Sequence, residues 1–169
     1  MHKISVKTLT AVALFIALEV VLSRFGSIAT AELKIGFGFV PLAICAMLYG
    51  PAWAAVAGGL ADFIGAVLFP IGPYFPGFTL TNALIGLIFG LFLRRRPAGI
   101  ANICAASLIT CLFCSLVLNS LWISILYHSP FIQLLPTRLL QCAVMIPVEI
   151  VVLTLLRQPV ARLARSRAI

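Results

Sequence analysis

Charged residues are scarce in this sequence. Only 9% of its 169 residues are Asp, Glu, Lys or Arg, whereas soluble globular proteins average about a quarter. Hydrophobic residues make up 63% of the chain, and the mean hydropathy is +1.19. This composition is typical of an integral membrane protein. Because a membrane-spanning helix needs roughly 20 mainly apolar residues, the chain has room for about six spans and no separate soluble domain.

The sequence also lacks the motifs of several enzyme classes. It contains no G-x-x-x-x-G-K-[ST], and therefore no P-loop for nucleotide phosphates. It contains neither H-E-x-x-H nor G-x-S-x-G, and its two histidines are too few and too scattered for a metal hydrolase. No inverted repeat with paired broken helices is evident, which weakens the case for a self-contained secondary transporter. The chain is predicted to bind a molecule without energising its movement.

All five cysteines lie inside apolar runs: Cys45, Cys104, Cys111, Cys114 and Cys142. Cys111 and Cys114 form a C-x-x-C, but no second pair or nearby histidine completes a zinc set. We interpret them as small packing residues, with a redox or metal role as the alternative. No metal and no cofactor is expected.

The apolar runs predict an all-α membrane protein in which residues 1–169 form a single domain of six transmembrane helices. Gly50-Pro51, the loop "FPIGPYFPG" at 69–77, the turn "RRRP" at 94–97 and "HSP" at 128–130 separate the runs. The expected spans lie near 4–23, 36–50, 51–69, 78–93, 99–127 and 135–158.

The basic residues predict the orientation. With six spans, nine of the twelve Lys and Arg residues fall on the side of the two termini, which the positive-inside rule places in the cytoplasm. These nine are Lys3, Lys7, Arg94, Arg95, Arg96, Arg157, Arg162, Arg165 and Arg167. The net charge of +8 therefore reflects orientation, and nucleic-acid binding is not expected. An alternative is a cleaved signal peptide ending at "ATA" (29–31), but Glu19 and Arg24 interrupt the approach to that site.

Ionisable residues within the spans indicate a structural or binding role, because inserting each one at mid-helix costs about 2.5–3.5 kcal/mol on insertion scales. Asp62 either hydrogen-bonds a neighbouring helix or accepts a ligand. Arg138 either extends to the outer interface or pairs with an anionic ligand, and we favour the ligand. Glu19 and Glu149 are expected to form internal pairs and are left outside the site.

Uncharged polar residues and aromatic residues gather toward the same membrane face. Asn119 and Trp122 share one face of the fifth span; an interhelical hydrogen bond is the alternative for Asn119, and an interfacial aromatic belt is the alternative for Trp122 and Tyr127. Together these positions predict an outward-facing pocket for a flat, polar-edged ring joined to an anionic tail. Its expected residues are Arg24, Asp62, Tyr74, Phe75, Phe78, Asn119, Trp122 and Arg138.

Four stretches resemble a known family. They are "ALFIALEVVLSRF" (13–25), "LKIGFGFVPLAI" (33–44), "YGPAWAAVAGGLADFIGAVLFPIGPYFPGFTLTNALIGLIFG" (49–90) and "LNSLWISILYHSPFIQLLPTRL" (118–139). Taken together they are similar to the folate-specific S components, the substrate-binding subunits of energy-coupling factor (ECF) transporters. The resemblance covers nearly the whole chain.

The resemblance implies a six-helix subunit of the bacterial plasma membrane that captures folate at the outer face. Such subunits dock on a transmembrane coupling subunit joined to two ATPases, so this chain is not expected to be an enzyme. The resemblance also implies that Ala13 and Ala17 belong to the docking surface. Two alternatives stay open: an S component for another vitamin, such as riboflavin or thiamine, and a small intramembrane enzyme.

Overall fold

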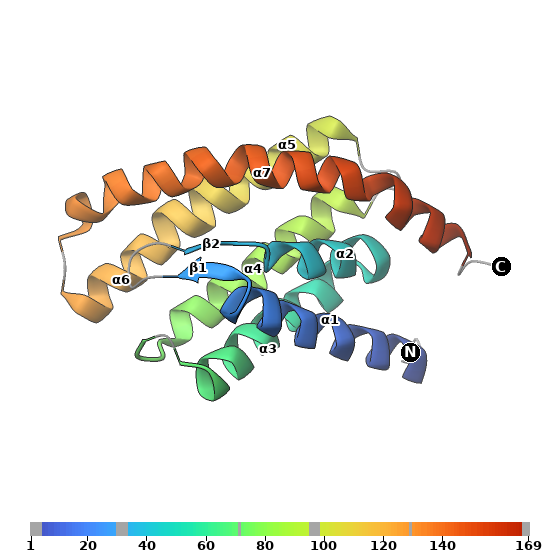
Figure 1. Cartoon of the computed structure of the whole chain (residues 1–169), viewed down its shortest axis with the longest axis horizontal. Helices are drawn as coiled ribbons and strands as arrows, with labels where there is room; N and C mark the ends of the chain where they lie inside the picture. The colour runs from blue at the N-terminus through green and yellow to red at the C-terminus, as the bar shows by residue number, and fades with distance from the viewer. Residues whose placement is uncertain (1–4, 30–33, 71, 95–98, 129, 167–169) are drawn as a thin grey trace.

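The structure, a computed structural model, describes residues 5–29, 34–70, 72–94, 99–128 and 130–166. Six helical rods and one short β-hairpin make up this part of the chain (Figure 1). The rods are α1 (Val6–Arg24), α2 (Phe39–Tyr49), α3 (Pro51–Leu68), α4 (Pro76–Leu93), the continuous run of α5 (Ile100–Ile109), η1 (Thr110–Leu118) and α6 (Asn119–Tyr127), and α7 (Phe131–Ser166).

Five of the six rods are long and apolar enough to cross a membrane. The exception is α2, whose 11 residues extend only about 16 Å at the rise of an α-helix, against about 30 Å of hydrocarbon. The predicted span at 36–50 begins too early, because residues up to Gly36 belong to a β-strand and α2 begins at Phe39. The predicted span at 135–158 is too short, because α7 runs from Phe131 to Ser166 through three internal prolines, which membrane helices tolerate.

The sequence did not predict the hairpin. Strand β1 (Ser27–Ala29) pairs antiparallel with β2 (Lys34–Gly36), and Ser27 lies opposite Gly36. A Cβ atom at Gly36 would overlap the side chain of Ser27, so glycine is required for this pairing. The hairpin occupies residues that the prediction assigned to the first loop and the start of the second span.

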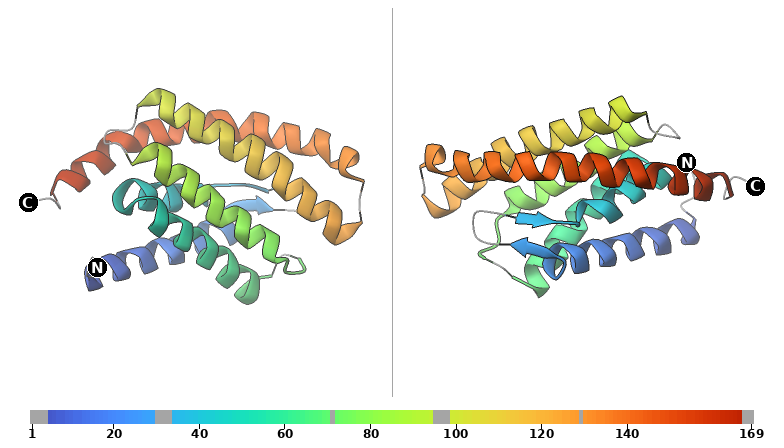
Figure 2. Two further views of the ribbon diagram at one scale, coloured as in Figure 1. Left: turned by 180° about the vertical axis from the view of Figure 1, so that it is seen from behind. Right: turned by 45° about the horizontal axis from the view of Figure 1, so that its top comes forward.

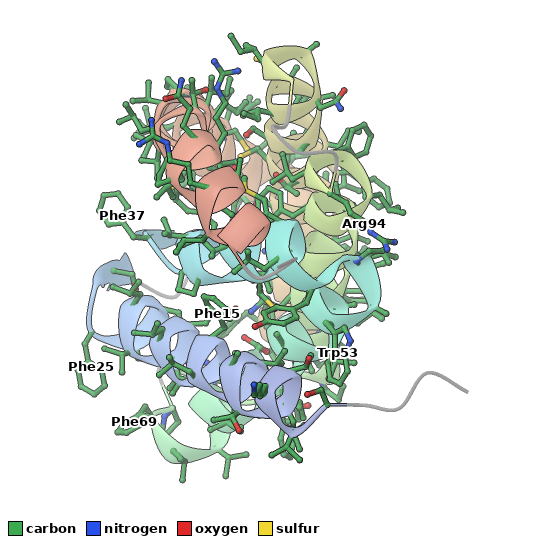
Figure 3. All side chains as sticks on the ribbon, turned by 90° about the vertical axis from the view of Figure 1, so that its right-hand side faces the viewer. Phe15, Phe25, Phe37, Trp53, Phe69 and Arg94 are labelled. Atoms are coloured by element: carbon green, nitrogen blue, oxygen red, sulfur yellow. The ribbon has the colours of Figure 1, made fainter. Side chains whose placement is uncertain are left out.

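Glycines bring α3 and α4 into close contact. A Cβ atom at Gly86 would overlap the backbone of Ala54, and one at Gly58 would lie against the carbonyl of Asn82. In membrane proteins, small residues let helix backbones approach closely. The cluster of buried residues continues into α2 and α7; Phe15 of α1 points inward to meet Tyr49 edge to face (Figure 3).

The two termini lie at one end of the molecule (Figures 1 and 2). The β-hairpin, the α3–α4 connection and the start of α7 lie at the opposite end, called here the hairpin end. This arrangement gives each helix a known direction: α1 runs toward the hairpin end, and α7 runs away from it.

Candidate ligand site

A cavity of about 270 Å³ lies between the helices and extends to the hairpin end. Its walls come from α1, the hairpin, α2, α3, the α3–α4 connection, α4, the run from η1 to α6, and α7. Segment η1 is π-helical, a rare geometry that is frequent at functional sites. It contributes Thr110, Cys111 and Ser115 to the wall.

Seven of the eight residues expected in the pocket line this cavity. They are Arg24, Asp62, Tyr74, Phe75, Phe78, Asn119 and Arg138. The structure thus brings together side chains from five separate segments of the sequence.

Trp122 is the expected residue that is not in the wall. Its indole nitrogen donates a hydrogen bond to the Thr81 hydroxyl at 3.0 Å, and its ring packs on Phe75 with centroids 5.6 Å apart. Thr81 in turn donates to the carbonyl of Gly77. Because Phe75 and Thr81 both line the cavity, Trp122 supports the wall from behind.

A polar network ties α1 to α3 and to the loop before α4. The Arg24 guanidinium lies 3.8 Å from one oxygen of Asp62, and the Thr79 hydroxyl donates to the other at 3.0 Å. Tyr74 and Thr79 share a hydrogen bond of 3.2 Å. Gly65 leaves room for Arg24, since a Cβ atom there would lie 2.7 Å from its Nε. Both carboxylate oxygens of Asp62 therefore have partners within the protein.

Arg138 and Asn119 face the cavity from α7 and α6. Arg138 is only 5% exposed and donates to the Gln141 amide oxygen at 2.9 Å. Its side chain lies inside the bundle and does not extend to the interface. The side-chain oxygen of Asn119 is buried, and no donor among the described residues reaches it. A buried acceptor without a donor is costly, so Asn119 favours a ligand that supplies one.

Glu19 and Glu149, which the sequence reasoning left outside the site, also line the cavity. They are 3% and 6% exposed. Glu149 accepts from the Cys111 thiol at 3.7 Å. The Thr110 hydroxyl lies 3.4 Å from the carboxylate, but its one hydrogen is accepted at 2.9 Å by the Ala106 carbonyl. The signal that could have found Glu149 is its spacing from Arg138: eleven residues are about three helical turns, so both side chains lie on one face of α7.

On α1 and α7, the charges that line the cavity are ordered by sign along each helix. On α1, Arg24 is the last residue and Glu19 lies five residues earlier, about 7.5 Å farther from the hairpin end. On α7, Arg138 precedes Glu149 by eleven residues, about 16 Å of helix. Both guanidiniums therefore lie nearer the hairpin end, and both of these carboxylates lie deeper.

Ala13 and Ala17 are not among the residues that line the cavity, and both are exposed on the outer face of α1. The neighbouring Leu14 and Leu18 are exposed as well. The buried residues of α1 are Val12, Glu19, Val20 and Ser23. The face that carries the two alanines is therefore not packed against another described helix of the chain.

The cysteines form no metal site in the described residues, which contain no group of three or more His, Cys, Asp or Glu side chains placed to hold an ion. All five thiols are free. Four are buried, and Cys142 donates to the backbone carbonyl of Cys111. These contacts fit a packing role.

Comparison with known proteins defines the class. Residues 7–157 match the family model described as "ECF transporter, substrate-specific component". The chain is 37% identical over 141 residues to a protein named folate transporter FolT from Clostridium novyi, covering 83% of this chain and 82% of that protein. It is 28% identical over 154 residues to folate transporter FolT from Leuconostoc mesenteroides, covering 88% and 83%. A crystal structure described as FolT bound with folic acid superposes with a TM-score of 0.86 at 32% identity, over 93% of this chain and 98% of that one.

This chain belongs to the substrate-specific components of ECF transporters. It is a multi-pass protein of the bacterial cell membrane. The predicted class and the helical membrane architecture are confirmed, and the short β-hairpin is the element that the prediction lacked.

Proposed function

We propose that this protein captures folate at the outer face of the membrane and presents it for uptake by an ECF transporter. The observation that carries the proposal is its similarity, along nearly the whole chain, to a structure with folic acid bound. The relatives named folate transporters point to the same ligand.

The cavity supports this ligand chemically. Folate joins a flat heterocycle to a benzoyl ring and a tail with two carboxylates. Arg24 and Arg138 lie nearer the hairpin end and offer charge-assisted hydrogen bonds to the tail. Phe75 and Phe78 add apolar walls, which suit aromatic rings. In this arrangement the tail lies toward the hairpin end and the heterocycle lies deeper.

The proposal also assigns the protein an orientation in the membrane and assigns roles to its residues and to the partner subunits. Residues 1–169 act as one membrane domain with both termini in the cytoplasm, so the hairpin end faces outward. The expected pocket residues contact the ligand, with Trp122 acting through Phe75 and Thr81. ATP hydrolysis belongs to two ATPase subunits joined to a transmembrane coupling subunit, and the exposed face at Ala13 and Ala17 docks on that coupling subunit.

Mass spectrometry of the small molecule that co-purifies with the protein tests the ligand. We expect a folate. Recovery of riboflavin, thiamine or another vitamin instead would keep the class and replace the ligand. Affinity purification from the native membrane tests the partners: ATPase subunits should co-purify with this chain and should be lost with a docking-face variant.

A further inference from the structure

We propose that Glu149 accepts hydrogen bonds from the amino-pyrimidinone edge of the ligand's heterocycle and thereby selects pterins over related bicyclic rings. This inference rests on the proposed function. The edge of a pterin carries two adjacent donors, the ring N3–H and the 2-amino group. A carboxylate presents two adjacent acceptors and matches this pair as it matches the paired donors of a guanidinium.

The position of Glu149 suits a residue that recognises this edge of the ligand. It lines the cavity and is 6% exposed. Its face of α7 carries Arg138, Cys142 and Met145 into the same cavity. About 16 Å of helix separates Glu149 from Arg138, a span suited to an extended molecule of two ring systems and a tail. With the tail carboxylates at Arg138, the heterocycle reaches Glu149.

The contacts of Glu149 leave acceptor capacity for a ligand. The Thr110 hydroxyl lies 3.4 Å from the carboxylate, longer than the usual 2.7–2.8 Å of an O–H···O hydrogen bond, and its one hydrogen is accepted at 2.9 Å by the Ala106 carbonyl. The Cys111 thiol, at 3.7 Å, is a weak donor. Within the described residues no cation lies within ion-pair distance of this carboxylate. A buried acid held by long contacts gains more from two ligand donors than a saturated one does.

Glu19 provides the matched comparison. It is a second buried carboxylate in the wall of the same cavity, and it already interacts within the chain. It lies on α1, the helix that also carries Arg24, whereas Glu149 lies beside the π-helical segment. The same substitution at both positions therefore distinguishes specific recognition of the heterocycle by Glu149 from a general effect of removing a buried negative charge.

The experiment compares folic acid with its 2-deamino-2-oxo analogue, which has the same tail but presents a carbonyl where folic acid has the amino group. Purified wild-type protein should bind folic acid about 10- to 100-fold more tightly, because a carboxylate repels the carbonyl and bonds the amine. Glu149→Gln exchanges one acceptor for a donor. It should weaken the binding of folic acid and leave the binding of the analogue unchanged or tighter. The ratio of the two affinities should therefore fall to near unity.

Because Glu19 also lines the cavity, Glu19→Gln should shift the affinities for folic acid and for the analogue together and so keep the wild-type ratio between them. Equal binding of the two ligands by wild-type protein would overturn the inference even if Glu149→Gln does not fold. An equal loss of affinity for both ligands in Glu149→Gln would also overturn the inference. The same holds if Glu19→Gln, and not Glu149→Gln, abolishes the preference for folic acid. Failure of wild-type protein to bind folic acid at all would refute the proposed function itself. That outcome differs from the ones above, which would refute only the role of Glu149.

Discussion

The guanidinium of Arg24 lies 3.8 Å from the carboxylate of Asp62, and this ion pair joins α1 to α3 in the wall of the cavity. Both side chains are 11% exposed. Removing one member of a buried pair leaves the other charged and desolvated, at a typical cost of about 3–5 kcal/mol. The pair is therefore expected to organise the site as well as to contact ligand.

A double-mutant cycle tests this relationship. Arg24→Ala and Asp62→Ala should each lower the midpoint of thermal unfolding in detergent. The double variant should lose less stability than the sum of the single variants, with a coupling of about 1–3 kcal/mol. Strictly additive losses would show that the two residues act independently.

Arg138→Ala should weaken folate binding about 10- to 100-fold, because it removes a buried charge-assisted hydrogen-bond donor. Arg162→Ala is the control, since Arg162 is exposed near the far end of α7. Calorimetric titration measures both. If Arg138 serves only to brace Gln141, its variant should melt earlier while the folded fraction binds folate normally.

Ala13→Trp should leave the purified subunit folded and able to bind folate, because Ala13 is exposed on the outer face of α1. It should abolish folate uptake in cells by blocking assembly with the coupling subunit. The control is Leu91→Trp on α4, at a position 62% exposed. Normal uptake by Ala13→Trp would argue against the docking surface.

Gly86→Ala should destabilise the protein by about 1–3 kcal/mol, because its Cβ atom would overlap the backbone of Ala54 and force α3 and α4 apart. Gly59→Ala is the matched control on α3. Its Cβ atom would meet the Cβ of Ala83 at 3.5 Å, an ordinary contact. Thermal unfolding should therefore show a loss only for Gly86→Ala; equal midpoints would contradict the close packing.

Much of the architecture could be predicted from the sequence because a bilayer imposes strong rules on length and composition. The breaks at Gly50-Pro51 and in the loop before α4 are marked by residues that end helices. The hairpin could not be predicted, since its strands contain only three residues each and its pairing depends on Gly36 fitting against Ser27.

The site could be predicted only in part. Arg138 and Asn119 stand out because polar groups are rare in apolar runs. Glu149 was left outside the predicted site because its depth suggested an internal pair; the structure places it in the wall of the cavity. The π-helical turns of η1 also change the angular position of each residue relative to an α-helix, so α-helical spacing cannot predict which side chains of residues 110–118 face inward.

Calorimetric titration of the purified subunit with folic acid, in detergent and without ATP or partner subunits, is the decisive test of the proposed function. We expect saturable binding of one folate per chain. We also expect that excess riboflavin or thiamine does not compete with folic acid. Tight binding of one of those vitamins, with no heat from any oxidised or reduced folate, would contradict the proposed function.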